Sequence, residues 1–80
     1  MHAASYAGLV EPVPVIFGRQ VRAARQKLGW TQERLARECG KHPTYIGGIE
    51  RGERNPTLTV AQAIASALGR PLADLIREDG

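Results

Sequence analysis

The segment from Gln32 to Ile49 constrains the fold of this chain more than any other. It has the pattern of two short helices joined by a turn of about four residues. Helices that cross through so tight a turn need small residues where their backbones approach. Ala36 and Gly40 are small at these places, and the apolar residues around them are Leu35, Cys39, Ile46 and Ile49. Size, polarity and spacing together predict a helix-turn-helix motif.

The remaining sequence also has helical periodicity. Phe17, Val21, Ala24 and Leu28 lie on one face of a helix expected from about Val15 to Gly29. Further start and stop signals bound the other helices: Thr31 to Gly40, Pro43 to Gly52, Thr57 or Thr59 to Gly69, and a short helix after Pro71. No run alternates with the period of a strand. We therefore expect an all-α domain of five helices over residues 15–80, preceded by a flexible tail at residues 1–14.

Composition limits the classes of protein that remain. A chain of 80 residues, 42% hydrophobic and 24% charged, suits one soluble globular domain. Its single cysteine cannot form an internal disulfide, and no apolar run approaches the ~18 residues of a membrane span. The start of the chain has no signal-peptide pattern, so we expect a cytoplasmic protein. So short a chain rarely forms a catalytic pocket, which favours a binding module over an enzyme.

Basic residues are concentrated in the middle of the chain. Residues 19–54 hold nine Lys and Arg against four Glu, whereas the remainder has a net negative charge. This distribution is typical of a protein that binds a polyanion. An ordinary solvated mixture of charges is the alternative that charge alone leaves open.

These features resemble a known family. The stretch FGRQVRAARQKLGWTQERLARECGKHPTYIGGIERGERNPTL resembles the Xre family of lambda-repressor/Cro-like DNA-binding domains, over about residues 16–77. Within that family, HPTYIGGIERGERNPTL is similar to the controller proteins of restriction–modification systems, which are small homodimeric regulators of their own operon. The resemblance implies a five-helix lambda-repressor-like fold that binds double-stranded DNA in a sequence-specific way. An antitoxin, a phage-type repressor and a protein-interaction module on the same fold are the alternatives.

In such a motif the second helix enters the major groove, and its first residues meet base edges. The outward positions expected here are Pro43, Thr44, Tyr45, Gly47 and Gly48. Thr44 suits a base or a thymine methyl group, whereas the two glycines have no side chain to read a base. Either the glycines allow a very close approach to DNA, or DNA shape contributes more than direct contacts. Since glycine disfavours helix, Gly48→Ala is predicted to raise the melting temperature, unless the glycine is needed for close approach or packing.

Phosphate contacts are expected at the edges of the motif. The resemblance implies that Thr31 and Gln32 hold a phosphate at a helix N-terminus, where free N–H groups favour an anion. It also implies backbone contacts from Arg51, Arg54 and Asn55, with a base edge as the alternative for Arg54. His42 is expected at the start of its helix or facing a phosphate. The remaining basic residues Arg19, Arg22 and Lys41 fit a solvent-facing role equally well.

Two charged residues have a structural interpretation. The resemblance implies that Arg25 and Glu50 form a partly buried ion pair between the first helix and the end of the third. Removing one partner of such a pair costs about 3–5 kcal/mol, because the other charge is left unpaired. Glu50→Ala should therefore reduce folding first and DNA binding only as a consequence.

The C-terminal apolar residues suggest an interface between two copies of the chain. One recognition helix reads few base pairs, so we expect a homodimer with Leu72, Leu75 and Ile76 in its interface, unless they only close the monomer core. Residues 1–14 form either a loose tail or a contact with the partner subunit. Cys39 and Trp30 are expected to pack in the core, and His2, His42 and Cys39 do not have the spacing of a metal site. No cofactor, membrane contact or small-molecule effector is expected.

Overall fold

The computed structural model describes residues 11–78, which form an all-α fold and contain no strand. The helices are α2 (Val13–Lys27), α3 (Gln32–Cys39), α4 (Pro43–Glu50), α5 (Leu58–Leu68) and α6 (Leu72–Leu75). Each corresponds to a helix expected from the sequence, so the predicted fold class is confirmed.

Helix α2 begins earlier than the sequence pattern predicted. Its first residue is Val13, and Pro12 and Pro14 occupy the N-cap and first turn, where the missing proline N–H leaves no helical hydrogen bond broken. The expected boundary between tail and domain after residue 14 is thus wrong, since residues 13 and 14 are helical. The rest of the expected tail, residues 1–10, lies outside the described part of the chain.

Two threonines and a glycine fix the ends of the helices as expected. The Thr31 hydroxyl oxygen accepts a hydrogen bond from the Arg34 N–H at 3.0 Å and caps α3. Of the two candidates at α5, Thr57 is the cap, and its hydroxyl accepts from the Val60 N–H at 3.2 Å. Gly40 ends α3 with a φ of 70°, a conformation that side chains other than glycine rarely adopt. The short turn at residues 40–42 then leads directly into α4.

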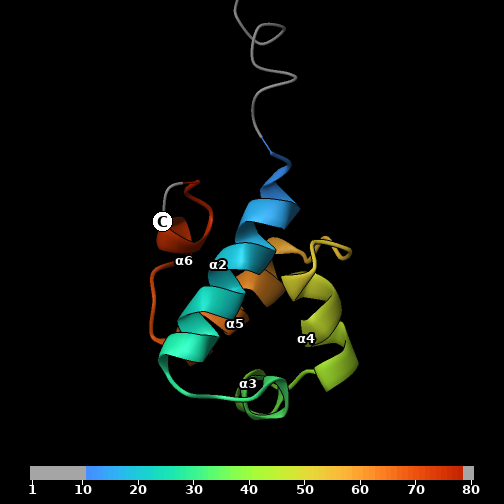
Figure 1. The fold of residues 1–80 in the computed structure, drawn as a ribbon, viewed down its shortest axis with the longest axis vertical. Coiled ribbons are helices and arrows are strands. Elements are labelled where there is room, and N and C mark those ends of the chain that lie inside the picture. The colour runs from blue at the N-terminus through green and yellow to red at the C-terminus, as the bar shows by residue number, and fades with distance from the viewer. Residues whose placement is uncertain (1–10, 79–80) are drawn as a thin grey trace, which may run out of the picture.

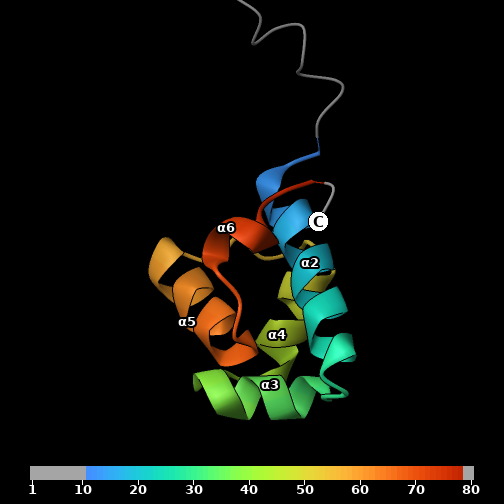
Figure 2. The same ribbon diagram turned by 90° about the vertical axis from the view of Figure 1, so that its left-hand side faces the viewer.

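One continuous core holds the helices together. Its fully buried side chains come from every helix of the fold: Val21, Leu35, Ile46, Ile49, Ile64 and Leu75. Helix α2 packs on α4, α5 and α6, while α3 packs on α4 and α5 (Figures 1 and 2). The helix-turn-helix pair α3–α4 is therefore supported from behind by α2 and α5, which leaves its other side exposed.

The contact between α2 and α4 is unusually close. A Cβ atom placed on Gly18 of α2 would overlap the Ile49 carbonyl oxygen, so only glycine fits there. The sequence pattern did not single out this residue. The contact sets the distance of α4 from α2, and thereby the position of the exposed side of α4.

Candidate nucleic-acid interface

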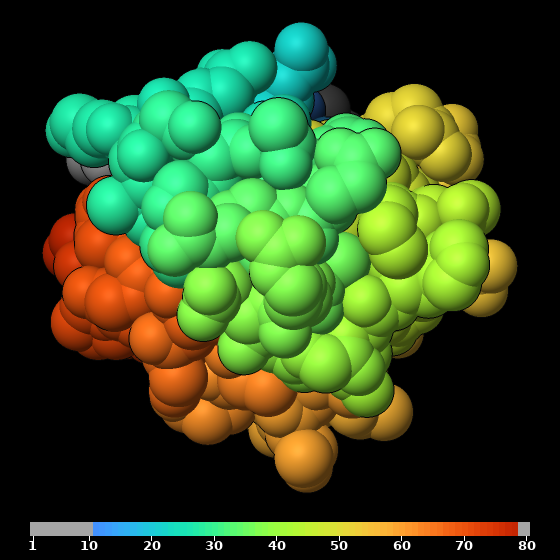
Figure 3. All heavy atoms as spheres, turned by 90° about the horizontal axis from the view of Figure 1, so that it is seen from below, coloured from blue at the N-terminus to red at the C-terminus, as the bar shows by residue number. Residues whose placement is uncertain are grey.

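Helices α3 and α4 share one face of the molecule. Seen from below, α3 crosses the middle of this face and α4 lies along its edge (Figure 3). The polar residues predicted to contact DNA come from the N-terminus of α3, the first turn of α4 and the segment that follows α4.

The first turn of α4 presents side chains to solvent. His42 is the N-cap, and its Nδ1 accepts a hydrogen bond from the Thr44 N–H at 3.2 Å. Thr44 is exposed, and Pro43 and Tyr45 are half-buried. In the neutral ring, an acceptor at Nδ1 leaves Nε2 as the donor. The helix therefore starts with several hydrogen-bonding groups at its free end.

The two glycines of α4 lie at outward positions, as expected, but they are buried and not open to a close approach by DNA. Gly47 and Gly48 are both buried. A Cβ atom on Gly47 would lie 3.2 Å from the Arg51 guanidinium and 3.4 Å from the Gln32 amide. On Gly48 it would lie 2.9 Å from the Arg54 side chain. The glycines are thus covered by polar side chains of their own chain and do not form a bare helix surface for DNA.

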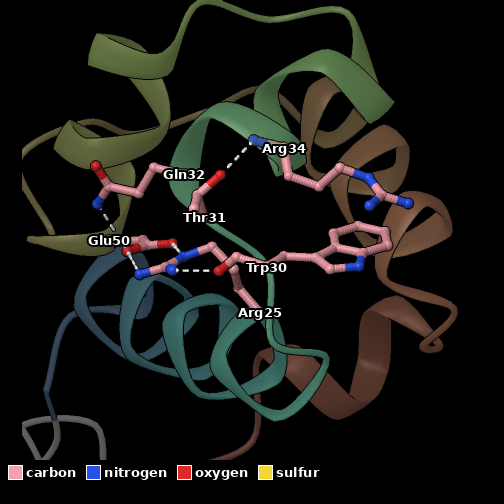
Figure 4. A network of polar contacts seen from close by, with 6 residues as sticks. All are labelled: Arg25, Trp30, Thr31, Gln32, Arg34 and Glu50. Carbon is pink, nitrogen blue, oxygen red and sulfur yellow. Dashed lines mark hydrogen bonds and ion pairs between the residues drawn. The ribbon is translucent and has the colours of Figure 1, made fainter.

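A buried polar network joins α2, α3 and α4, as Figure 4 shows. Arg25 donates to both carboxylate oxygens of Glu50, with Nε–Oε2 and Nη2–Oε1 distances of 2.6 and 3.0 Å. It also donates from Nη1 to the Trp30 carbonyl oxygen at 2.7 Å. The carboxylate raises the pKa of the Arg25 guanidinium by hydrogen bonding. The expected ion pair between Arg25 and Glu50 is present, with the Glu50 side chain only 2% exposed.

Gln32 belongs to this network. Its Nε2 donates to Glu50 Oε1 at 3.0 Å, so the side chain is tied inward, toward the ion pair. The amide carbonyl and the second amide hydrogen have no partner among residues 11–78. Thr31, its neighbour, is exposed and keeps its hydroxyl hydrogen available after capping α3. The role of both residues in phosphate binding stays a prediction.

Basic side chains border the same network. A polar hollow of about 240 Å³ is lined by Arg22, Arg25, Gln32, Glu50 and Arg51. Arg51 is exposed and pairs with Glu53 at 3.1 Å, and Asn55 is exposed beyond it. The sequence left the role of Arg22 open, because a helical pattern does not show that this arginine of α2 lies beside Arg51, which follows α4. Its spacing from Arg25 on α2 was the only available signal.

Trp30 and Cys39 pack against the core, as expected. The Trp30 ring is also stacked under Arg34, whose guanidinium carbon lies 4.6 Å from the ring centre. Burial raises the pKa of the Cys39 thiol, which keeps it protonated. Over residues 11–78, no three His, Cys, Asp or Glu residues are grouped as a metal site would require, and no helix is both long and apolar enough to cross a membrane.

The expected dimer residues separate into two groups. Leu75 is 1% exposed and belongs to the core of its own chain, so its assignment to an interface is wrong. Leu72 is half-buried, whereas Ile76 is exposed. Both line an apolar groove of about 160 Å³ together with Val13, Phe17, Leu58 and Ala61. The sequence pattern placed Leu58 among the inward-facing residues of its helix and Val13 in the tail, but both are exposed in the structure, at 81% and 57%.

Comparison with known proteins agrees with this architecture. The family model described as "Helix-turn-helix" matches residues 21–75. The chain is 45% identical over 65 residues to the control protein C.BamHI of Bacillus amyloliquefaciens, covering 80% of each protein. It is 40% identical over 65 residues to the control protein C.SmaI of Serratia marcescens, covering 81% of this chain and 77% of that protein.

A solved structure gives the same result. The restriction-modification controller protein C.AhdI from Aeromonas hydrophila superimposes with a TM-score of 0.74 and 39% identity, covering 78% of this chain and 94% of that chain. The family match includes α3, α4 and most of the helices that support them. This chain therefore belongs to the helix-turn-helix family.

Proposed function

We propose that the protein is a sequence-specific DNA-binding transcription regulator in which α4 is the recognition helix. The observation that carries the proposal is the surface of α4, where exposed Thr44 and half-buried Tyr45 lie in the first turn and exposed Arg54, from the segment after the helix, reaches the Tyr45 ring. The major groove of B-DNA admits one α-helix, whose N-terminal residues then reach base edges. Thr44 can bond a base or touch a thymine methyl, and Arg54 can reach a guanine or a phosphate.

Phosphate contacts from both sides would hold the helix in place. We assign them to Thr31 and Gln32 at the N-terminus of α3, and to Arg51 and Asn55 after α4. His42 can donate from Nε2 at the start of α4. Arg22 joins this set, because it lines the same hollow as Gln32 and Arg51. Such contacts set the register of the protein on DNA without reading its sequence.

We assign the regulator to the restriction–modification controllers and expect it to act as a homodimer in the cytoplasm. The similarity to two control proteins and to the controller C.AhdI supports this class. The apolar groove at Val13, Leu58 and Ile76 supports self-association, because a two-fold dimer would cover its exposed apolar side chains. Genes for a methyltransferase and an endonuclease beside its own gene are the expected genomic setting.

Binding to a labelled duplex from its own upstream region, measured by fluorescence anisotropy over a salt series, tests the proposed function. We expect affinity at least about a hundredfold above that for a random duplex, and a steep fall with salt from released counterions. Thr44→Ala should reduce the preference for the upstream duplex. Thr59→Ala, the same change on α5, should leave it unaltered. Equal affinity for both duplexes, or none for either, would contradict the proposal and favour a protein-interaction module.

A further inference from the structure

Gly48 is buried although it lies on the outward part of α4. Its cover is the Arg54 side chain: a Cβ atom on Gly48 would lie 2.9 Å from Arg54 Cγ, 3.6 Å from Nε and 3.8 Å from Cδ. The aliphatic part of Arg54 thus rests directly on the helix backbone. Any side chain at position 48 would occupy this space and force Arg54 to move.

The turn after α4 brings Arg54 to this position. Gly52 has a φ of 75°, and its N–H donates to the Ile49 carbonyl oxygen at 2.9 Å. The Glu53 N–H donates to the carbonyl oxygen of Gly48 itself, also at 2.9 Å. This pair of bonds is the Schellman motif, which reverses the chain at a helix end. The residue that follows, Arg54, therefore starts beside Gly48.

Packing alone sets the direction of the Arg54 guanidinium. Its carbon lies 5.5 Å from the centre of the Tyr45 ring, in the range of a cation–π contact. In residues 11–78 it forms no ion pair or side-chain hydrogen bond, whereas Arg51 is paired with Glu53. No group in the described residues therefore occupies the five N–H donors of Arg54, which can bind a ligand. The aliphatic part of the Arg54 side chain packs on Gly48, and its guanidinium group lies against the Tyr45 ring.

We propose that Gly48 is a positioning residue for DNA recognition, which acts through Arg54. The missing side chain allows Arg54 to lie across α4 and to stack on Tyr45 before DNA is bound. A long arginine that is already ordered loses less conformational entropy when it contacts DNA. This inference rests on the proposed function. The inference goes beyond the proposed function, because it gives Gly48 a role in DNA affinity that is separate from its role in folding.

A double-mutant cycle tests the inference with the upstream duplex. Gly48→Ala should weaken binding about three- to tenfold, the loss expected when one long side chain must be ordered on binding. In the Arg54→Ala background the same change should alter affinity less than twofold. Gly47→Ala is the matched control, because its Cβ would meet Arg51 and Gln32 instead of Arg54. Its effect should be equal in both backgrounds.

Two outcomes of this cycle overturn the inference. One is an unchanged affinity of Gly48→Ala, and the other is an equal loss with and without Arg54. If the wild-type protein does not prefer the upstream duplex, the proposed function itself fails, which is a different result. NMR of the free protein gives a test that needs no DNA. The Tyr45 ring should shift the Arg54 side-chain protons upfield. Gly48→Ala should move these shifts back toward the values of a free arginine. Arg54 proton shifts that do not change with Gly48→Ala would contradict the inference.

Discussion

Glu50 is the residue on which the geometry of the motif most depends. Its buried carboxylate accepts hydrogen bonds from Arg25 of α2 and from Gln32 of α3, and it belongs to α4 itself. Arg25 in turn donates to the Trp30 carbonyl in the loop between α2 and α3. A single carboxylate thereby fixes the relative positions of three helices. Because the Arg25 side chain is only 11% exposed, loss of Glu50 leaves a largely buried guanidinium unpaired.

We predict that Glu50→Ala lowers the free energy of unfolding by about 3–5 kcal/mol, measured by urea denaturation. The control is Glu38→Ala, which removes an exposed ion pair with Arg34 and should cost less than about 0.5 kcal/mol. Replacing both buried partners, Arg25→Met with Glu50→Leu, should recover part of the loss, because no charge is then left unpaired. A Glu50→Ala protein of normal stability that has lost only DNA binding would contradict the structural role of Glu50.

The sequence predicted this ion pair but not the burial of the glycines in α4. The resemblance to the Xre family implied the pair, and the structure contains it. Gly48 is covered because the chain reverses at Gly52 and places the Arg54 side chain beside it. A helical pattern does not predict this placement. Leu75 was misassigned for a similar reason, because an apolar residue near a chain end fits the core and an interface equally well.

At the scale of elements, α4 is held against α2 by a contact between backbones. Gly18 of α2 faces the carbonyl oxygens of Ile49 and Glu50, and a Cβ atom on Gly18 would overlap the first and lie 3.0 Å from the second. Only a helix without a side chain at this point can approach so closely. The helical periodicity did not point to Gly18, because a glycine inside a helix normally lowers its stability and the pattern does not show what a glycine contacts.

We predict that Gly18→Ala lowers the melting temperature by about 4–24 °C. The added methyl group forces α2 away from α4, and overpacking of this kind costs about 1–3 kcal/mol, where each kcal/mol shifts Tm by roughly 4–8 °C in a domain of this size. Gly48→Ala makes the same change inside a helix but meets only an exposed arginine side chain. Circular dichroism should show an equal or higher Tm for that control. A Gly18→Ala protein as stable as wild type would show that the two helices do not need this contact.

At the scale of the whole molecule, the protein has a polar surface and an apolar groove. The polar side carries the first turn of α4 and the network around Glu50. The apolar groove at Val13, Leu58 and Ile76 lies at the other end of α2 from Leu28. The all-α fold was predictable because each helix has an apolar face and most have a start or a stop signal in the sequence. The groove was not, since it forms only when α2, α5 and α6 come together.

We predict that Leu58→Glu reduces self-association, because Leu58 is 81% exposed in the single chain and a charge there opposes its burial in a dimer. Sedimentation equilibrium should show a dimer for wild type and a monomer for the variant, with weaker binding to the upstream duplex. Leu28→Glu also places a charge at an exposed leucine, but at the far end of α2, and should stay dimeric. Wild-type protein that remains monomeric at high concentration and on DNA would exclude the homodimer.

The central claim is that the free end of α4 lies in the major groove. Backbone amide shifts in the NMR spectrum, recorded with and without the upstream duplex, test it most directly. The largest changes should fall at residues 31–32, 42–45 and 51–55, with small changes along α5. The largest changes on α5 and α6, with residues 42–45 unaffected, would contradict the claim.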